Sequence, residues 1–254
     1  MSGGLRSGIG GLIPHHVGNE TLVKLWDTAS KRAGKADPAE RRANRAAFRN
    51  HVDRIRESCG LIEDQPCYGD MRYGRVSMAY AGCEIIAVFN ALSFLTGKMP
   101  RLDRLIEAFG KDGVSFKGRF GTAPLAAVRF LRRLGFSAEP VFLREDMEAL
   151  AASCRALILV YYNDGDDIGA MVHTIFISKE NGRLTAHNAG MGGMAGPRAR
   201  DLAELIGKLA GGNAREIMLI GIEKIGNCET RSASPQSRIK QGRNPALSGF
   251  IDQN

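Results

Sequence analysis

The segment that decides the fold reads Met78-Ala79-Tyr80-Ala81-Gly82-Cys83-Glu84-Ile85-Ile86-Ala87-Val88-Phe89-Asn90-Ala91-Leu92. Gly82 can take a turn, and the apolar run from Ile85 onward predicts a buried helix that begins at Cys83. Unpaired backbone N–H groups and the helix dipole favour a thiolate at this position, and the thiolate is the nucleophilic form of cysteine. Taken alone, however, a cysteine in an apolar stretch is more often a packing residue, so partners decide the interpretation.

Residues 172–189 predict a β-hairpin with Asn181-Gly182 at the turn. If these two residues form the whole loop, Glu180 pairs with Arg183, and the numbers of all paired residues sum to 363. A four-residue loop preserves this register, whereas an odd loop or a bulge would reverse the faces of one strand.

This register places two polar residues on one face of the hairpin. Ile175 then faces Asn188, and His173 shares the face of Ile175 because side chains alternate along a strand. We therefore expect the Asn188 side-chain oxygen to orient the His173 imidazole, while His187 points to the opposite face. The shifted register would make His187 the partner instead.

Nucleophilic catalysis by cysteine needs a base within hydrogen-bond reach and a third group that orients the base. Cys83, His173 and Asn188 supply candidates for all three roles, in the order in which the papain-like cysteine peptidases carry them. The chain resembles that superfamily over about residues 65–225. Within it, the chain is most similar to the bacteriocin-processing, double-glycine leader peptidases and their stand-alone bacterial relatives.

Two positions depart from the pattern of these families. The families usually carry a glutamine six residues before the cysteine, where its amide donates to the oxyanion, but Ser77 stands there in this chain. Gln65 lies far upstream, although it could still reach the site. The other departure is Glu84, which replaces a common glycine and would raise the thiol pKa if it faced the site.

The remaining pattern predicts an α+β fold, in which helices precede an antiparallel sheet. We expect helices around residues 102–109, from a Thr122 cap to Leu134, and over 146–153. Strands are expected over 156–162, in the hairpin, and over 217–225. The resemblance implies a papain-like arrangement, with the nucleophile helix packed against the sheet.

We expect three segments in the 254 residues: a basic, partly flexible extension over 1–60, a catalytic domain over 61–226, and a disordered basic tail over 227–254. Their net charges are about +5, 0 and +3, with the last two counted from a division at residue 223, and they account for the total of +8. In the extension, Asp37-Pro38 predicts the start of one amphipathic helix. No aromatic-interleaved basic groove or nucleic-acid motif accompanies the charge, so we expect solvated flanks and no nucleic-acid partner.

The five cysteines are odd in number and have no CxxC spacing, which indicates neither a disulfide framework nor a zinc site. We expect no cofactor and no metal. The sequence has no apolar stretch long enough for a membrane span and no signal-peptide pattern, so we expect a cytoplasmic protein. The sequence assigns no oligomeric state.

These observations lead to one main hypothesis and three alternatives. The main hypothesis is a cysteine hydrolase, most simply a peptidase that acts on a peptide or isopeptide bond of a peptide or protein substrate. Cys83 would attack, His173 would move the proton, Asn188 would orient His173, and the Cys83 N–H with Ser77 would bind the oxyanion. The alternatives are an amidase or acyltransferase with the same triad, a catalytically silent peptide-binding relative, and an interaction protein that recruits a partner through its basic extensions.

Overall fold

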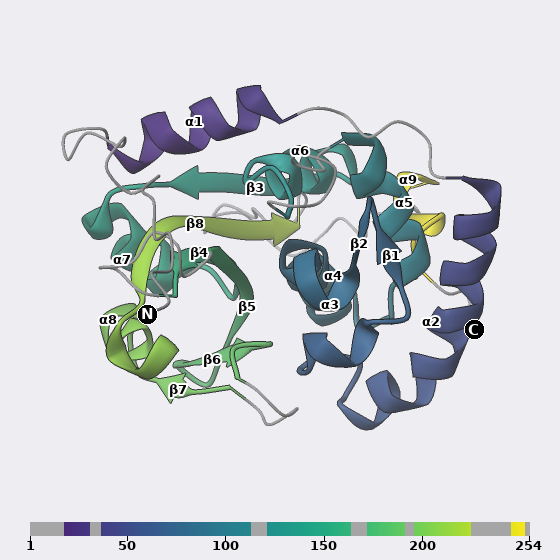
Figure 1. The fold of residues 1–254 in the computed structure, drawn as a ribbon. Coiled ribbons are helices and arrows are strands. Elements are labelled where there is room, and N and C mark those ends of the chain that lie inside the picture. The colour runs from purple at the N-terminus through teal and green to yellow at the C-terminus, as the bar shows by residue number, and fades with distance from the viewer. Residues whose placement is uncertain are drawn as a thin grey trace, which may run out of the picture.

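A six-stranded, fully antiparallel sheet forms the centre of the computed structural model (Figure 1), with strand order β3-β8-β4-β5-β6-β7. The structure describes residues 18–30, 37–112, 121–163, 172–190, 196–224 and 245–251. The strands of the large sheet are β3 (Phe136–Val141), β4 (Ala156–Tyr162), β5 (Val172–Glu180), β6 (Arg183–His187), β7 (Arg198–Ala199) and β8 (Arg215–Lys224). A separate two-stranded sheet joins β1 (Arg72–Tyr73) to β2 (Val76–Ser77).

Helices cover both faces of the large sheet. They are α1 (Asn19–Ala29), α2 (Pro38–Glu57), α3 (Met78–Ala81), α4 (Cys83–Thr96), α5 (Leu102–Asp112), α6 (Ala126–Arg133), α7 (Arg144–Ser153), α8 (Leu202–Ile206) and α9 (Pro245–Ser248), with short 3-10 helices at Gln65–Tyr68 and Leu209–Gly212. Helix α4 packs against β5 and β4, whereas α7 contacts β8 and α8 contacts β6. The predicted α+β class, with the nucleophile helix on an antiparallel sheet, is confirmed.

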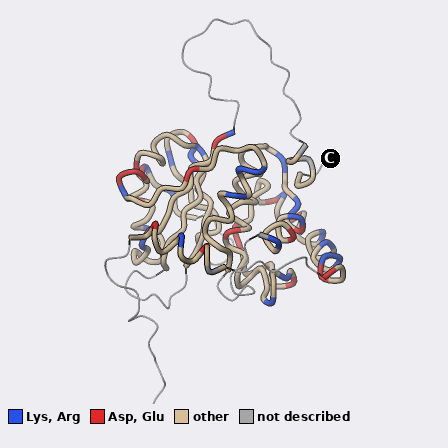
Figure 2. Tube along the Cα trace, turned by 90° about the horizontal axis from the view of Figure 1, so that it is seen from above, with Lys and Arg blue, Asp and Glu red and all other residues tan. Residues whose placement is uncertain are grey.

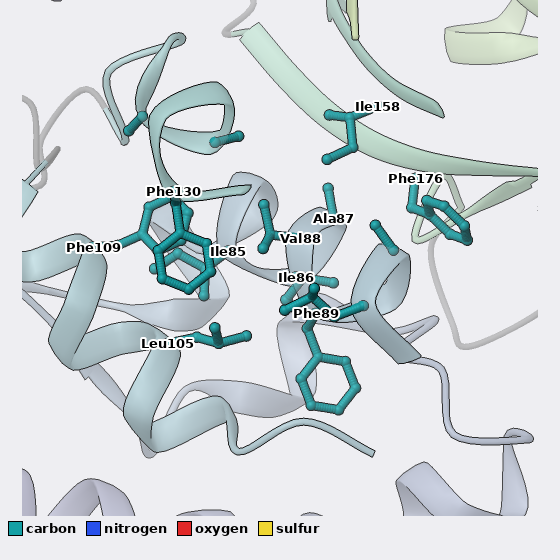
Figure 3. Close-up of a cluster of buried hydrophobic side chains, with 14 of the residues drawn as sticks. Ile85, Ile86, Ala87, Val88, Phe89, Leu105, Phe109, Phe130, Ile158 and Phe176 are labelled. Atoms are coloured by element: carbon teal, nitrogen blue, oxygen red, sulfur yellow. The ribbon is translucent and has the colours of Figure 1, made fainter. Parts of the chain in front are cut away.

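Helix α4 is the centre of the larger core. Figure 3 shows its Ile85, Val88 and Phe89 among side chains of α5, α6 and the sheet. A second core lies on the other side of the sheet, and β4 contributes to both because its successive side chains alternate between them. Burial on two faces explains why the predicted strand over 156–162 reads as one continuous apolar run.

The hairpin register agrees with the prediction. Asn181 and Gly182 both have positive φ, at 50° and 73°, as a tight hairpin turn requires. Glu180 pairs with Arg183, and the ladder continues to Phe176 opposite His187, so the sum of 363 holds along the whole pairing.

The N-terminal segment contributes directly to the main core. Helix α2 begins as expected, with Pro38 in its first turn and the Asp37 side chain accepting a hydrogen bond from the Ala39 N–H at 2.8 Å. Its Phe48 and Ile55 are buried in the same cluster as α4. The expected boundary near residue 60 is therefore no boundary in the hydrophobic core. Residues 1–17, which include the glycine-rich start, lie outside the described residues.

The C-terminal segment differs from the expected disordered tail. Residues 245–251 return to the helical side of the molecule, where Pro100 and Ile251 form an antiparallel bridge and the Phe250 carbonyl accepts a 2.7 Å hydrogen bond from the Arg101 N–H. Residues 225–244 lie outside the described residues.

Two other local expectations were wrong or incomplete. Thr122 does not cap α6, which begins at Ala126; its hydroxyl lies 3.0 Å from the Tyr73 hydroxyl instead. Strand β3 is not among the expected strands, and it contains Pro140, which has no N–H for the ladder. Its position at the edge of the sheet tolerates the missing N–H.

Basic and acidic residues are interleaved along much of the described chain (Figure 2). Arg41 and Arg45 of α2 form ion pairs with Glu107 and Asp103 of α5, so part of the basic charge of the N-terminal segment is neutralised within the fold. None of the described helices is both long enough and apolar enough to cross a membrane.

Candidate active site

The junction between α3 and α4 sets the position of Cys83. Gly82 ends α3 and precedes α4, with φ −88° and ψ 0°, and its N–H donates to the Met78 carbonyl at 2.9 Å. A Cβ at Gly82 would lie 2.5 Å from that same carbonyl oxygen. The glycine is therefore required by close approach, since its φ is ordinary, and it brings Cys83 to the first residue of α4.

Cys83 is half-buried, and its sulfur lies against β5. Burial raises the pKa of the thiol, while the N–H and hydroxyl of Thr174 and the N–H groups of Glu84 and Cys83 lower it by a smaller amount. The N–H groups at the helix start act in the direction expected from the sequence. Burial outweighs them, so the resting side chain is a neutral thiol at neutral pH.

Glu84 is buried, and its side chain contacts another helix. Its Oε1 accepts a 2.9 Å hydrogen bond from the Ala127 N–H at the start of α6. Burial raises the pKa of this carboxyl well above its ordinary value and so favours its protonated form in the fold. The departure from glycine at this position thus has a structural role, because Glu84 satisfies an N–H group that α6 leaves unpaired.

His173 contacts Asn188 directly. Its Nε2 lies 2.8 Å from the Asn188 backbone carbonyl oxygen. Since a carbonyl only accepts, Nε2 carries the proton in the neutral ring, and the lone pair is on Nδ1. Burial lowers the pKa of His173, which keeps the imidazole neutral at neutral pH and leaves the Nδ1 lone pair free to accept a proton.

The structure corrects which atom of Asn188 contacts the imidazole. The side chain was expected to do so, but its Oδ1 accepts from the Gln65 N–H at 3.0 Å and its Nδ2 donates to the Gln65 Oε1 at 3.2 Å. The physical reason is the backbone. Asn188 has φ +59° and leaves the ladder after His187, so its carbonyl, and not its side chain, lies against His173.

His187, the alternative partner, is held elsewhere. Its Nδ1 lies 2.6 Å from the Glu63 Oε1, its Nε2 lies 2.8 Å from the Ser178 hydroxyl, and its ring stacks on Phe176 at 5.3 Å. Both ring nitrogens are therefore engaged by partners other than His173. The confirmed register excludes the shifted pairing that would have made His187 the orienting partner.

Gln65 is a site residue that the spacing did not assign. Its Nε2 donates to the carbonyls of Met78 and Ala79 in α3, both at 3.1 Å, while its backbone N–H and Oε1 bind the Asn188 side chain. It therefore joins the helix before the nucleophile to the residue that holds His173. Only its residue type pointed to a role, because the intervening β1–β2 sheet separates it from Cys83 in sequence.

Ser77, the oxyanion candidate, lies in β2 opposite Arg72 and precedes α3. It is half-buried, and α3 separates it from Cys83 along the chain. Its side chain does not cap α3.

Cys83 lies against the end of β5 that carries His173. Thr174, whose N–H and hydroxyl face the sulfur, directly follows His173. Tyr161 borders both groups: its ring meets the His173 ring edge-on at 5.8 Å, and the Cys83 charge adds to the burial that raises the Tyr161 pKa. Among the described contacts of these two residues there is no direct hydrogen bond from thiol to imidazole.

The described parts of the chain contain no group of three or more His, Cys, Asp or Glu side chains that could hold a metal ion. Cys59, Cys67, Cys83 and Cys154 are all free thiols.

No protein-family model matches the chain, and no curated protein matches it in sequence. Among solved structures, it is similar to the peptidase domain of Streptococcus ComA, a bifunctional ABC transporter involved in a quorum-sensing pathway. That similarity has a TM-score of 0.39 and 12% sequence identity, and it covers 57% of this chain and 92% of the other.

Proposed function

We propose that this protein is a papain-like cysteine peptidase with Cys83 as nucleophile and His173 as general base. The observation that carries the proposal is the state of His173. Its Nε2–H is held by the Asn188 carbonyl and its pKa is lowered, which leaves a neutral ring with a basic Nδ1. Cys83 begins α4 against the residue that follows His173.

Both partners start neutral, which defines the first step. As the Cys83 sulfur attacks the scissile carbonyl carbon, Nδ1 of His173 takes the thiol proton, and the carbonyl oxygen becomes an oxyanion. The imidazolium then gives that proton to the leaving nitrogen as the C–N bond breaks. Water attacks the acyl-enzyme with His173 again acting as base, and this step releases the acid and restores the thiol.

The oxyanion would be bound at the start of α4. The first N–H groups of a helix have no partner within it, and those of Cys83 and Glu84 lie near the sulfur. Ser77 stays a proposed further donor to the oxyanion. The Gln65 amide is less suited, since both of its N–H groups point to carbonyls of α3.

The same geometry supports hydrolysis of a peptide or isopeptide bond, and also amidase or acyl-transfer chemistry on the same acyl-enzyme. A cytoplasmic location and a peptide or protein substrate stay predictions.

A second candidate function is a silent peptide-binding protein with this fold. The raised pKa of Cys83 favours it, as does the absence, among the described contacts, of a hydrogen bond from the Cys83 thiol to the His173 imidazole. The two candidates differ in whether His173 activates the thiol.

Acylation by p-nitrophenyl acetate tests this difference. We expect a burst of nitrophenol at pH 7, with the acetyl group located on Cys83 by mass spectrometry. In His173→Ala, the acylation rate of Cys83 should fall by about 10²-fold or more, as loss of a general base does. Cys59 is an exposed internal control in the same sample, and its acylation should not change. Equal Cys83 rates in the two proteins would favour the silent-binder alternative.

A further inference from the structure

Residues 62–65, which we call the bridging segment, connect the nucleophile helix to the residue that holds His173. At one end, the fully buried Asn90 of α4 binds Ile62 twice: its Oδ1 accepts from the Ile62 N–H at 2.7 Å, and its Nδ2 donates to the Ile62 carbonyl at 2.9 Å. The position of the bridging segment is therefore fixed by the same helix that begins at Cys83.

Glu63 is the next residue, and its carboxylate binds two groups at the end of β6. Its Oε2 accepts a 2.9 Å hydrogen bond from the Asn188 N–H, and its Oε1 lies 2.6 Å from Nδ1 of His187. A hydrogen bond to a charged acceptor is stronger than one between neutral groups. Glu63 therefore holds the peptide unit that enters Asn188.

The backbone of Asn188 needs such support. A φ of +59° costs a non-glycine residue free energy, although asparagine tolerates it better than most residues do. This conformation brings the Asn188 carbonyl to Nε2 of His173 at 2.8 Å. If the N–H on the other side of the residue lost its partner, the carbonyl would be free to turn away.

Ser178, His187 and Glu63 together form a row of hydroxyl, imidazole and carboxylate, with distances of 2.8 Å and 2.6 Å. Ser178 is only 5% exposed, so it is poorly placed to attack a substrate. The row instead fixes the Glu63 carboxylate. The His187 ring is held by Ser178 and by stacking on Phe176, so its Nδ1 holds Glu63 Oε1 in one position.

We propose that Glu63 is a positioning residue of the active site: by binding the Asn188 N–H, it keeps the Asn188 carbonyl on His173 Nε2 and so maintains the tautomer with a basic Nδ1. This inference rests on the proposed function for its catalytic meaning. Glu63 itself touches neither His173 nor Cys83 in the contacts described. Its effect passes through the backbone of Asn188.

The test uses the imidazole nitrogens as a reporter that needs no turnover. Two-dimensional ¹H–¹⁵N spectra of the full chain, labelled at histidine, distinguish a ring protonated at Nε2 from one protonated at Nδ1. In the wild type, we expect His173 to be in the Nε2–H form. In Glu63→Gln, which keeps the size of the side chain but has a single acceptor oxygen, we expect a mixture of tautomers and a Cys83 acylation rate lowered by about tenfold or more.

Two further variants separate the carboxylate from its neighbours. Ser178→Ala removes the other hydrogen bond of His187 and leaves the Glu63 contact to Asn188, so the His173 tautomer should stay as in the wild type. Asn188→Gly keeps the backbone N–H, the carbonyl and the positive φ but deletes both side-chain contacts with Gln65. His173 should therefore retain the Nε2–H form in Asn188→Gly. The tautomer of this variant tests the proposal even if Glu63→Gln does not fold.

The outcomes are distinct. An unchanged His173 tautomer in folded Glu63→Gln, or its loss in Asn188→Gly, would overturn the positioning role of Glu63. Failure of the proposed function gives another result, namely Cys83 acylation that does not depend on His173 while the tautomer still responds to Glu63.

Discussion

At the scale of single residues, Glu84 is a buried carboxyl group beside the nucleophile. It is only 3% exposed, and its one described hydrogen bond comes from the Ala127 N–H. Within the described part of the chain, no basic side chain forms an ion pair with it. A carboxylate in that position would have to give up its hydration for one neutral donor, which explains why its pKa is raised well above 4.5.

This raised pKa predicts a stability that depends on pH. Because the folded state binds the Glu84 proton more tightly than the unfolded state does, the contribution is fully present below pH 4.5 and is lost as the pH rises toward the folded pKa. Glu84→Gln has no such proton and can still accept from Ala127. The free energy of unfolding of Glu84→Gln, relative to that of the wild type, should therefore increase by up to about 1.4 kcal/mol per pH unit above pH 4.5.

Urea unfolding at pH 4.5 and pH 7.5 measures this difference. Glu57→Gln, at an exposed position of α2, is the matched control. Its free energy of unfolding should stay close to that of the wild type at both pH values. A wild-type protein that gains stability relative to Glu84→Gln on going to pH 7.5 would mean that Glu84 is ionised and favourably paired in the fold.

At the scale of elements, buried asparagines attach helices to neighbouring chain segments. Asn44 of α2 donates to the Arg72 carbonyl at 2.9 Å and accepts from the Arg72 N–H at 2.8 Å, and it is only 3% exposed. Asn90 of α4 does the same with Ile62. Each asparagine side chain thus satisfies both the N–H and the carbonyl of one backbone residue, as a neighbouring strand would do in a sheet.

Asn44→Ala should destabilise the fold by about 2–3 kcal/mol, because it leaves both polar groups of the Arg72 backbone without these partners. Asn50→Ala is the control: it is the same substitution in the same helix, at an exposed position, and should change stability by less than about 0.5 kcal/mol. Chemical unfolding followed by circular dichroism compares the two. Equal effects would show that α2 is attached by its apolar face alone.

These elements also show what the sequence could and could not predict. The Asn181-Gly182 turn fixes a local register, and the apolar periods of α4 and β4 depend only on nearby residues, so these predictions were confirmed. Asn44 and Asn90 bind partners that are 28 residues away in each case, and no local pattern encodes such a pair. The same reason hid Gln65, whose contact with Asn188 spans 123 residues.

The contact between His173 and Asn188 was predicted to the level of residues but not of atoms. His173 and Asn188 do meet, because the hairpin register places them near one another. The side chain of Asn188 turned out to bind Gln65, since its positive φ takes it out of the strand geometry on which the expectation depended. Burial of Cys83 likewise depends on the packing of α4 on β5, which a helix dipole argument does not include.

At the scale of the whole molecule, residues 245–251 pack against helices from the first half of the chain. The C-terminal residues lie beside α5, where the Phe250 ring meets the Phe130 ring edge-on at 5.3 Å and Leu247 packs against the main core. Since Phe130 also contacts Phe109 at 5.0 Å, the last described segment of the chain adds to the cluster that surrounds α4.

Removal of residues 245–254 should therefore destabilise the fold around α4, and not only shorten a tail. We expect a loss of about 2–4 kcal/mol, from exposed apolar surface and from the Arg101 N–H that loses its acceptor. Phe250→Ala should account for about 1–2 kcal/mol of it, because this ring is only half-buried. Leu143→Ala, which truncates a side chain that is 69% exposed, is the control for loss of a large apolar group and should change little. Thermal and urea unfolding of the three variants would decide the matter: a truncated protein as stable as the wild type would mean that the segment rests on the core without stabilising it.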